Sequence, residues 1–162
     1  MAFPRREEEL TIREFRPGDE IAFRRLNEEW IVRFFALEPK DEYTLTDPQK
    51  TILNPGGRIF LAVRDGETVG CCALLAMRPG EFEVAKMAVT ESCQGAGIGR
   101  RLLEEAIAGA RAVGATRLFL ETNKRMAAAV RLYESLGFEH IPPERVTPSP
   151  YARSDVSMEL YL

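Results

Sequence analysis

The spacing of apolar and polar positions predicts helices and strands along the first part of the chain. Residues 10–15 alternate apolar and polar side chains, as a half-exposed strand does, and Pro17-Gly18-Asp19 can turn the chain and cap a helix. From Glu20 to about Leu37 apolar side chains recur at helical spacing. We expect a long helix with one buried stripe made of Phe23, Leu26, Trp30 and Phe34.

The middle of the chain changes from a polar segment to β-rich runs. Residues 39–57 are rich in turn formers and predict a surface loop region, although Asp47-Pro48 is typical of the start of a short helix that ends at Gly56. Three β-rich runs follow, separated by two turn sequences. They predict two hairpins and three antiparallel strands, at residues 59–63, 69–77 and 82–89.

Helices and strands alternate in the remainder. Beyond Gly99 the apolar residues fall on one helical face, and Gly114 is placed to end that helix. A strand at residues 116–121, a helix at 126–136 stopped by Gly137, and a strand at 156–160 complete the pattern. This order predicts an α/β (α+β) fold.

Length, composition and charge limit what such a fold can do. With 162 residues, 45% of them apolar, the chain can close one core, so we expect a single domain over residues 1–162. The formal net charge of -3 gives no positive field to attract nucleic acid or anionic lipid. The first nine residues lack the apolar run of a signal peptide, and no stretch of membrane-spanning length is free of charge. We therefore expect a cytoplasmic protein without nucleic-acid or membrane partners.

The cysteines and the histidine argue against a disulfide scaffold and a metal centre. Cys71, Cys72 and Cys93 form no C-x-x-C pair and suit a reducing compartment. His140 is the only histidine and has no neighbouring ligands at metal-binding spacing, so neither a histidine-based zinc site nor a Ser-His-Asp triad is easily assembled. We expect no metal.

A glycine-rich loop between a strand and an amphipathic helix carries the strongest chemical signal. Its glycines let backbone NH groups approach a bulky anion at the positive end of the helix dipole. A dinucleotide fingerprint starting at Gly95 would need glycine where the chain has Arg100, and no Walker sequence is present. A glycine-rich turn without a ligand is the alternative to a pyrophosphate site. The loop is Gln94-Gly95-Ala96-Gly97-Ile98-Gly99-Arg100.

Three pieces of sequence resemble the GNAT (Gcn5-related N-acetyltransferase) superfamily. Gln94-x-x-Gly97-x-Gly99 resembles its Q/R-x-x-G-x-G/A signature, residues 85–89 resemble its fourth strand, and residues 132–138 resemble its L-Y-x-x-x-G-F element. The match is specific from about residue 59 to 138 and weaker at both ends. It implies a mixed, mostly antiparallel sheet of about six to seven strands flanked by helices, with a V-shaped split between strands four and five.

The resemblance also implies a cosubstrate, acetyl-CoA, inserted into that split without a metal. Its pantetheine arm would pair with the backbone of Met87, Ala88 and Val89, as in strand addition, while the side chains of Met87 and Val89 can serve the core. Its pyrophosphate would lie on Gln94, Gly95, Ala96, Gly97, Ile98, Gly99 and Arg100. The family often has an asparagine where this chain has Met126, and Asn123 is a candidate replacement that can equally be a turn residue.

Acetyl transfer to an amine needs a group that accepts a proton and one that donates a proton. Tyr133, at the position of the family's usual general acid, would protonate the departing thiolate; a buried tyrosine with a satisfied hydroxyl is the alternative. Glu83 lies where several family members carry a base, and it shares a strand face with Met87 and Val89 by the two-residue period. Acting through water or with a pKa raised by desolvation, it would take the ammonium proton; a solvated strand-end glutamate is the alternative.

The resemblance thus predicts an N-acetyltransferase that acts by direct attack of a primary amine in a ternary complex. A small molecule or a peptide would supply the amine, against aromatic residues of the first helix and the following loop, namely Trp30, Phe34, Phe35 and Tyr43, and near residues 151–155. A non-catalytic acyl-CoA sensor is the alternative function. Cys93 adjoins the loop, where packing is favoured over a covalent role. Homodimers are frequent in the family, but no feature here fixes the oligomeric state.

Overall fold

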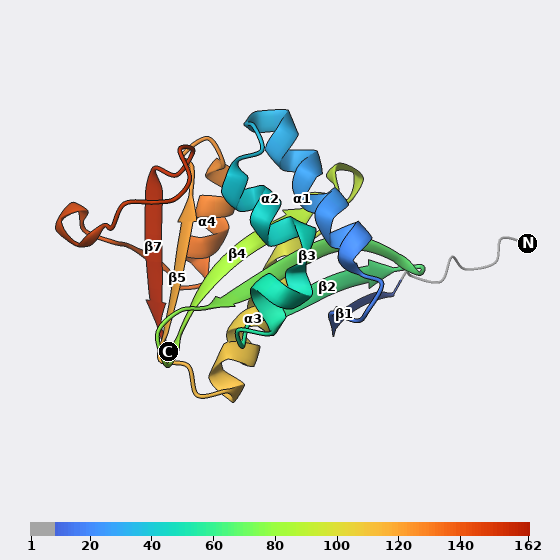
Figure 1. Cartoon of the computed structure of the whole chain (residues 1–162), viewed down its shortest axis with the longest axis horizontal. Helices are drawn as coiled ribbons and strands as arrows, with labels where there is room; N and C mark the ends of the chain where they lie inside the picture. Colours follow the sequence, from blue (N-terminus) through green and yellow to red (C-terminus); the bar gives the residue numbers. More distant parts are fainter. Residues whose placement is uncertain (1–8) are drawn as a thin grey trace, which may run out of the picture.

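The computed structural model describes residues 9–162 and is built on one seven-stranded sheet, in the order β1-β2-β3-β4-β5-β7-β6 (Figure 1). Adjacent strands are antiparallel except β4 and β5, which are parallel. The mixed sheet implied by the resemblance is confirmed, and β6 is a short strand that the pattern did not predict. The strands are β1 Leu10–Glu14, β2 Arg58–Arg64, β3 Glu67–Ala76, β4 Glu81–Val89, β5 Arg117–Thr122, β6 Glu139–His140 and β7 Val156–Tyr161.

Helices cover both faces of the sheet. In Figure 1, α1 and α2 lie on one side of β2 to β4, and α3 and α4 lie on the other. In the described part of the chain, no helix is long and apolar enough to cross a membrane. Residues 1–8, most of the stretch examined above for a signal peptide, lie outside the described residues. The helices are α1 Glu20–Phe34, α2 Pro39–Thr46, α3 Ile98–Ala112 and α4 Ala127–Ser135, with short turns η1 Gln49–Leu53, η2 Glu91–Cys93 and η3 Pro143–Arg145.

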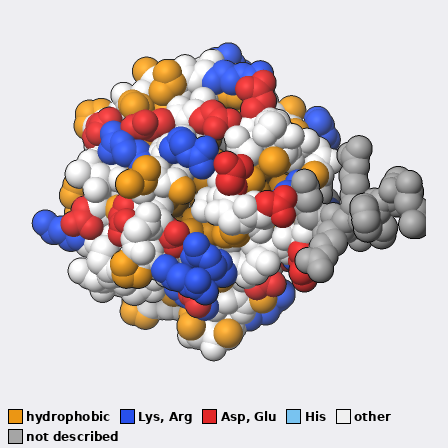
Figure 2. Space-filling view, turned by 90° about the vertical axis from the view of Figure 1, so that its right-hand side faces the viewer, with side chains coloured by type: hydrophobic (Ala, Val, Ile, Leu, Met, Phe, Trp, Pro, Cys, Tyr) orange, Lys and Arg blue, Asp and Glu red, His pale blue; other side chains and the backbone are white. Residues whose placement is uncertain are grey.

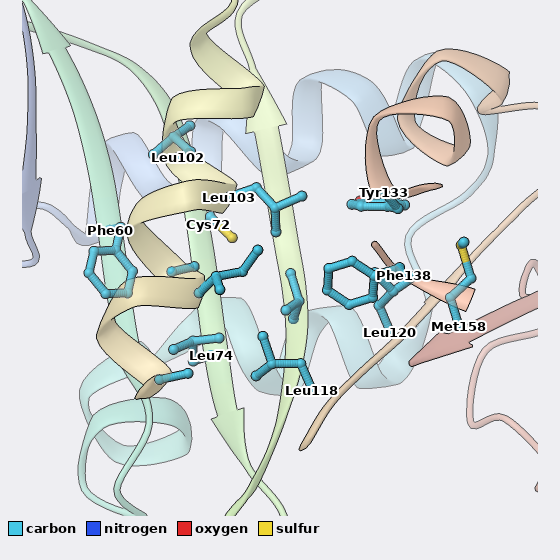
Figure 3. Close-up of a cluster of buried hydrophobic side chains, with 14 of the residues drawn as sticks. Phe60, Cys72, Leu74, Leu102, Leu103, Leu118, Leu120, Tyr133, Phe138 and Met158 are labelled. Carbon is cyan, nitrogen blue, oxygen red and sulfur yellow. The ribbon is translucent and has the colours of Figure 1, made fainter. Parts of the chain in front are cut away.

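Each face of the sheet has its own apolar cluster. Successive strand residues point to opposite faces, so Phe60 packs under α3 whereas Leu61 packs under α1. The α3 side contains the apolar stripe predicted for that helix and extends to Leu118, Tyr133 and Phe138 (Figure 3). The two clusters hold strands β2 to β4 between helical layers. The ends of β4 and β5 near the glycine loop are thereby fixed in position.

Helix α1 differs from its predicted stripe at its C-terminal end. Phe23 and Leu26 are buried as expected, but the buried face continues to Ile31 and the helix ends at Phe34. Trp30 and Phe34 are only half-buried because they lie over the open region between β4 and β5 rather than over the closed sheet. They are therefore available to line a site.

Most of residues 39–57 form helices that pack against the sheet, so the predicted surface loop region is wrong. Glu38 and Asp41 form a capping box around Pro39, the first residue of α2. The short helix predicted after Asp47-Pro48 is present as η1, a π-helix. Leu45 and Ile52 join the α1-side cluster. Polar composition misled the prediction because the polar residues buried here are hydrogen-bonded.

Charge is evenly distributed on the face of the molecule opposite β7. Figure 2 shows acidic and basic side chains interspersed there, with no broad area of one sign. A face of this kind offers no extended basic surface to a phosphate backbone.

Candidate active site

The glycine loop leads from the end of β4 into α3 and presents unpaired NH groups. Gly95 and Gly97 have φ of 83° and 77°, a region that favours glycine. Considering residues 9–162, none of the backbone NH groups of residues 95–100 donates a hydrogen bond within the protein. These donors lie at the N-terminus of a 15-residue helix, where the dipole is positive. The loop has the form of a site for a large anion.

The side chains of the loop mainly hold it in place. Gln94 Nε2 donates to Val89 O at 3.1 Å, which ties the loop to the end of β4. Arg100 donates to Ser135 Oγ of α4 at 2.7 Å. A Cβ on Gly99 would lie 3.5 Å from Leu132 Cδ2, an ordinary van der Waals contact, so Gly99 lies beside α4. The backbone NH groups are what the loop leaves for a ligand.

The sheet splits next to this loop. β4 pairs with β5 only through Glu81, Phe82 and Glu83, and the two strands diverge beyond that point (Figure 1). The β5-facing edge of residues 84–89 is therefore open. A cleft runs along it to the glycine loop and to α4, lined by Trp30, Phe34, Val84, Ala85, Lys86, Met87, Ala88, Val89, Gln94, Glu121, Thr122, Arg125, Met126, Ala127, Ala128, Ala129 and Tyr133.

A bulge in β4 separates residues expected on one face. Cys71 is opposite Ala88 but Ala73 is opposite Ala85, so β4 has one extra residue, and Lys86 there has φ of 52°. Beyond this bulge, each residue of β4 points to the opposite face of the sheet from the one that strict alternation would give. Met87 and Val89 pack against the α3-side cluster, whereas Glu83 lines a pocket beside α1. The prediction that Glu83 shares a face with these two residues is wrong.

Tyr133 lies at the inner wall of the cleft, on α4. Its ring is buried and packs against Phe138, with 5.9 Å between ring centroids (Figure 3). Burial raises the pKa of the hydroxyl, which therefore stays protonated at neutral pH. In the described residues no group accepts a hydrogen bond from it. A protonated and unpaired hydroxyl beside the open strand is suited to donate to a ligand in the cleft.

A smaller pocket joins the cleft on the α1 side. Glu83 and Glu121 reach it from β4 and β5. Burial, and then the charge of Glu121, raise the pKa of Glu83 to about 7, and burial also raises the pKa of Glu121. Glu121 accepts a hydrogen bond from Ser149 Oγ at 2.9 Å. The lining is Trp30, Phe35, Glu83, Ala85, Lys86, Glu121, Thr122, Asn123, Met126, Tyr151, Arg153 and Ser154.

A buried ion cluster, which the sequence analysis did not predict, forms one wall of this pocket. Asp41, fully buried on α2, accepts from Lys86 Nζ at 2.7 Å and from both terminal nitrogens of Arg153 at 2.7 Å. Although burial raises the pKa of a carboxyl, these hydrogen bonds lower that of Asp41 to about 2. Lys86 Nζ also donates to Tyr151 OH at 3.2 Å. The capping box at residues 38–41 was the available signal for α2, but nothing linked it to residues 86 and 153.

The structure places the remaining candidates in different positions. Asn123 lines the smaller pocket, but its amide donates to Arg153 O at 2.7 Å and to Asp155 at 3.3 Å, so it holds the loop before β7 and has no free donor for pantetheine. Tyr43 is 59% exposed and lines neither pocket, unlike the predicted wall residues Trp30 and Phe35. Cys93 packs against the α3-side cluster.

Metal-ligand geometry is lacking in residues 9–162, where no group of three or more His, Cys, Asp or Glu side chains could hold an ion. Donors for an anion and proton-transfer groups are what the site provides. Tyr133, the two carboxylates and Gln94 of the glycine loop border one continuous opening, because the cleft and the pocket share the lining residues Trp30, Ala85, Lys86, Glu121, Thr122 and Met126.

Comparison with known proteins identifies this arrangement. An IAA acetyltransferase from Azospirillum brasilense is 37% identical over 123 residues, which cover 75% of this chain and 77% of the relative. An acetyltransferase of the GNAT family from Staphylococcus aureus Mu50 superposes with a TM-score of 0.86 over 94% of this chain and 99% of its own, at 18% identity. A Bacillus subtilis acetyltransferase in complex with CoA superposes with a TM-score of 0.71, over 95% of this chain and 99% of its own, at 22% identity. Because the profile of the acetyltransferase (GNAT) family matches residues 23–138, this chain belongs to that family of acyltransferases.

Proposed function

We propose that the protein transfers an acetyl group from acetyl-CoA to a primary amine, by direct attack in a ternary complex. The observation that carries the proposal is the row of unpaired NH groups at residues 95–100, placed where the open edge of β4 meets α3. Family membership and the open split support the same conclusion.

The backbone holds the cosubstrate. The NH groups of residues 95–100 bind the pyrophosphate at the start of α3. The pantetheine amides pair with the free edge at Met87, Ala88 and Val89, in the manner of an added strand. Acetyl-CoA supplies the acetyl group as a thioester whose reactive end lies deep in the split. Gln94 supports this binding by fixing the loop to Val89.

Glu83 prepares the amine. An alkyl ammonium has a pKa of about 10 and cannot attack until it loses a proton. With a pKa raised to about 7, Glu83 is partly ionised at neutral pH and is a better acceptor than an exposed glutamate. It takes the proton directly or through a water molecule. The neutral amine nitrogen then attacks the thioester carbonyl carbon.

Tyr133 assists departure of the thiol. As the carbon–sulfur bond breaks, its hydroxyl donates a hydrogen bond and then its proton to the sulfur of CoA. The nitrogen of the new amide gives up its remaining excess proton, which returns through solvent to the tyrosine, and Glu83 releases to solvent the proton that it took from the ammonium. Ammonium and thioester are thereby converted to amide, free thiol and one released proton, and no group in the protein is permanently changed.

Calorimetric titration with acetyl-CoA tests the proposal most directly, with NAD and dephospho-CoA as comparison ligands. Saturable binding of acetyl-CoA without binding of NAD is expected because the loop lacks the dinucleotide spacing. Thiol release on addition of primary amines then measures transfer. A folded sample that binds no CoA species would overturn the proposal.

A further inference from the structure

Among the described residues, the pocket on the α1 side has carboxylates without ion-pair partners, and this charge arrangement selects among amines. Its positive side chains are Lys86 and Arg153, and both are hydrogen-bonded to Asp41. Arg153 is also paired with Glu38 Oε2 at 3.2 Å. The positive charges of Lys86 and Arg153 are therefore neutralised by the carboxylates of Asp41 and Glu38, in the wall of the pocket. In the described part of the chain, the pocket lining offers no cation that lacks a carboxylate partner.

Within residues 9–162, no Lys or Arg side chain forms an ion pair with Glu83 or Glu121. They come from β4 and β5, on the same face of the split; burial raises the pKa of both carboxyls, and the charge of Glu121 raises that of Glu83 further. The charges of Lys86 and Lys40 lower the pKa of Glu83, but by less than burial and Glu121 raise it. Lys40 Nζ lies over the Tyr43 ring at 5.0 Å, and Arg125 lines the cofactor cleft, where it donates to Phe34 O at 3.0 Å.

The rest of the lining is aromatic or apolar. Trp30 and Phe35 meet edge to face with centroids 6.3 Å apart. Tyr151 forms another wall, and the centroid of its ring lies 5.0 Å from Lys86 Nζ and 4.4 Å from Arg153 Cζ. Met126, which stands where the family often has an asparagine, completes this apolar surface. Apolar walls favour a ligand body with aromatic or aliphatic surface.

We propose that the acceptor is a primary amine with an aromatic or apolar body and no carboxylate next to the amine. Its ammonium supplies the positive charge that Glu83 and Glu121 lack, and its body packs on Trp30, Phe35 and Tyr151. A carboxylate on the same molecule would face two carboxylates, while Lys86 and Arg153, the cations of the described lining, are already bound to Asp41. This inference rests on the proposed function, which it narrows to one class of amine.

Matched pairs of amines test it. 2-Phenylethylamine with phenylalanine, and tryptamine with tryptophan, differ only by the carboxylate. On CoA-saturated protein, calorimetry is expected to show binding of each amine at least about tenfold tighter than of its amino acid, given the repulsion from two partly buried charges. The kcat/KM for thiol release from acetyl-CoA should show the same preference.

A conservative variant separates this inference from ordinary shape selection. Glu121→Gln removes one charge and keeps an oxygen for Ser149, so the preference for the amine over the amino acid should shrink several-fold. Glu144→Gln, at an exposed position outside the pocket, should leave the preference unchanged. Equal or tighter binding of the amino acids, failure of both amines to bind, or a preference unaffected by Glu121→Gln would overturn the inference. Failure of acetyl-CoA itself to bind would instead remove the proposed function.

Discussion

The two sides of the split are built from different parts of the protein. On the cofactor side, the contacts offered to a ligand are backbone groups of one continuous segment, from Met87 to Arg100. On the acceptor side, they are side chains from α1, α2, β4, β5 and the loop before β7. A backbone site depends on local conformation, whereas a side-chain site depends on tertiary packing. Substitutions should therefore affect the two sides in different ways.

The largest effect is expected where the two sides meet, at Tyr133. Tyr133→Phe removes the hydroxyl but keeps the ring against Phe138, so stability and acetyl-CoA affinity should change little. Loss of a positioned acid should lower kcat by roughly 10²–10⁴-fold. Steady-state thiol release and calorimetry measure the two quantities. Tyr161→Phe, on the exposed end of β7, is the matched control. An unchanged kcat would assign Tyr133 to packing and would remove its proposed role as the acid.

Asp41 should show how strongly the acceptor side depends on one buried side chain. Asp41→Asn leaves Lys86 and Arg153 buried without their shared carboxylate, which is expected to lower the free energy of unfolding by about 3–5 kcal/mol. Urea denaturation measures this loss. Glu42→Gln, the next residue of α2, breaks only an exposed pair with Arg24 and should cost less than about 1 kcal/mol. Similar losses in both variants would show that the cluster is not a structural requirement.

Glu83 should control the pH dependence of the rate. Its ionised form accepts the proton, and its pKa of about 7 is raised from 4.5, so kcat/KM should fall as pH drops through 7. Glu83→Gln should remove this fall in kcat/KM near pH 7 and lower the rate by about 10²-fold. The pH dependence that arises from deprotonation of the amine substrate should remain. Glu67→Gln, an exposed residue at the start of β3, should preserve the wild-type profile. If kcat/KM of Glu83→Gln still fell as the pH dropped through 7, the titration would belong to another group.

The same contrast explains what could be predicted from the sequence. The glycine loop, the strand before it and the helix after it are consecutive, so their periodicity and glycine spacing predicted the fold around the cofactor side. The bulge at Lys86 was not visible because an extra residue in a strand leaves the apolar pattern almost intact, and it moved Glu83 to the other face from Met87. The ion cluster joins residues 41, 86 and 153, whose proximity follows only from tertiary structure.

Glycine substitutions at the two ends of α3 test whether the cofactor side really depends on backbone conformation. Gly97 precedes the helix with φ of 77°, Gly114 follows it with φ of 79°, and an added Cβ would meet no atom within 4 Å at either position. Alanine should therefore strain both equally and cost about 1–2 kcal/mol of stability in each variant. Only Gly97→Ala also disturbs the NH groups of residues 95–100, so it alone should weaken acetyl-CoA binding, by roughly tenfold, since one or two charge-assisted hydrogen bonds would be lost. Thermal denaturation and calorimetry on the same samples measure both quantities. Equal affinities in the two variants would mean that side chains, and not the shape of the loop, hold the cosubstrate.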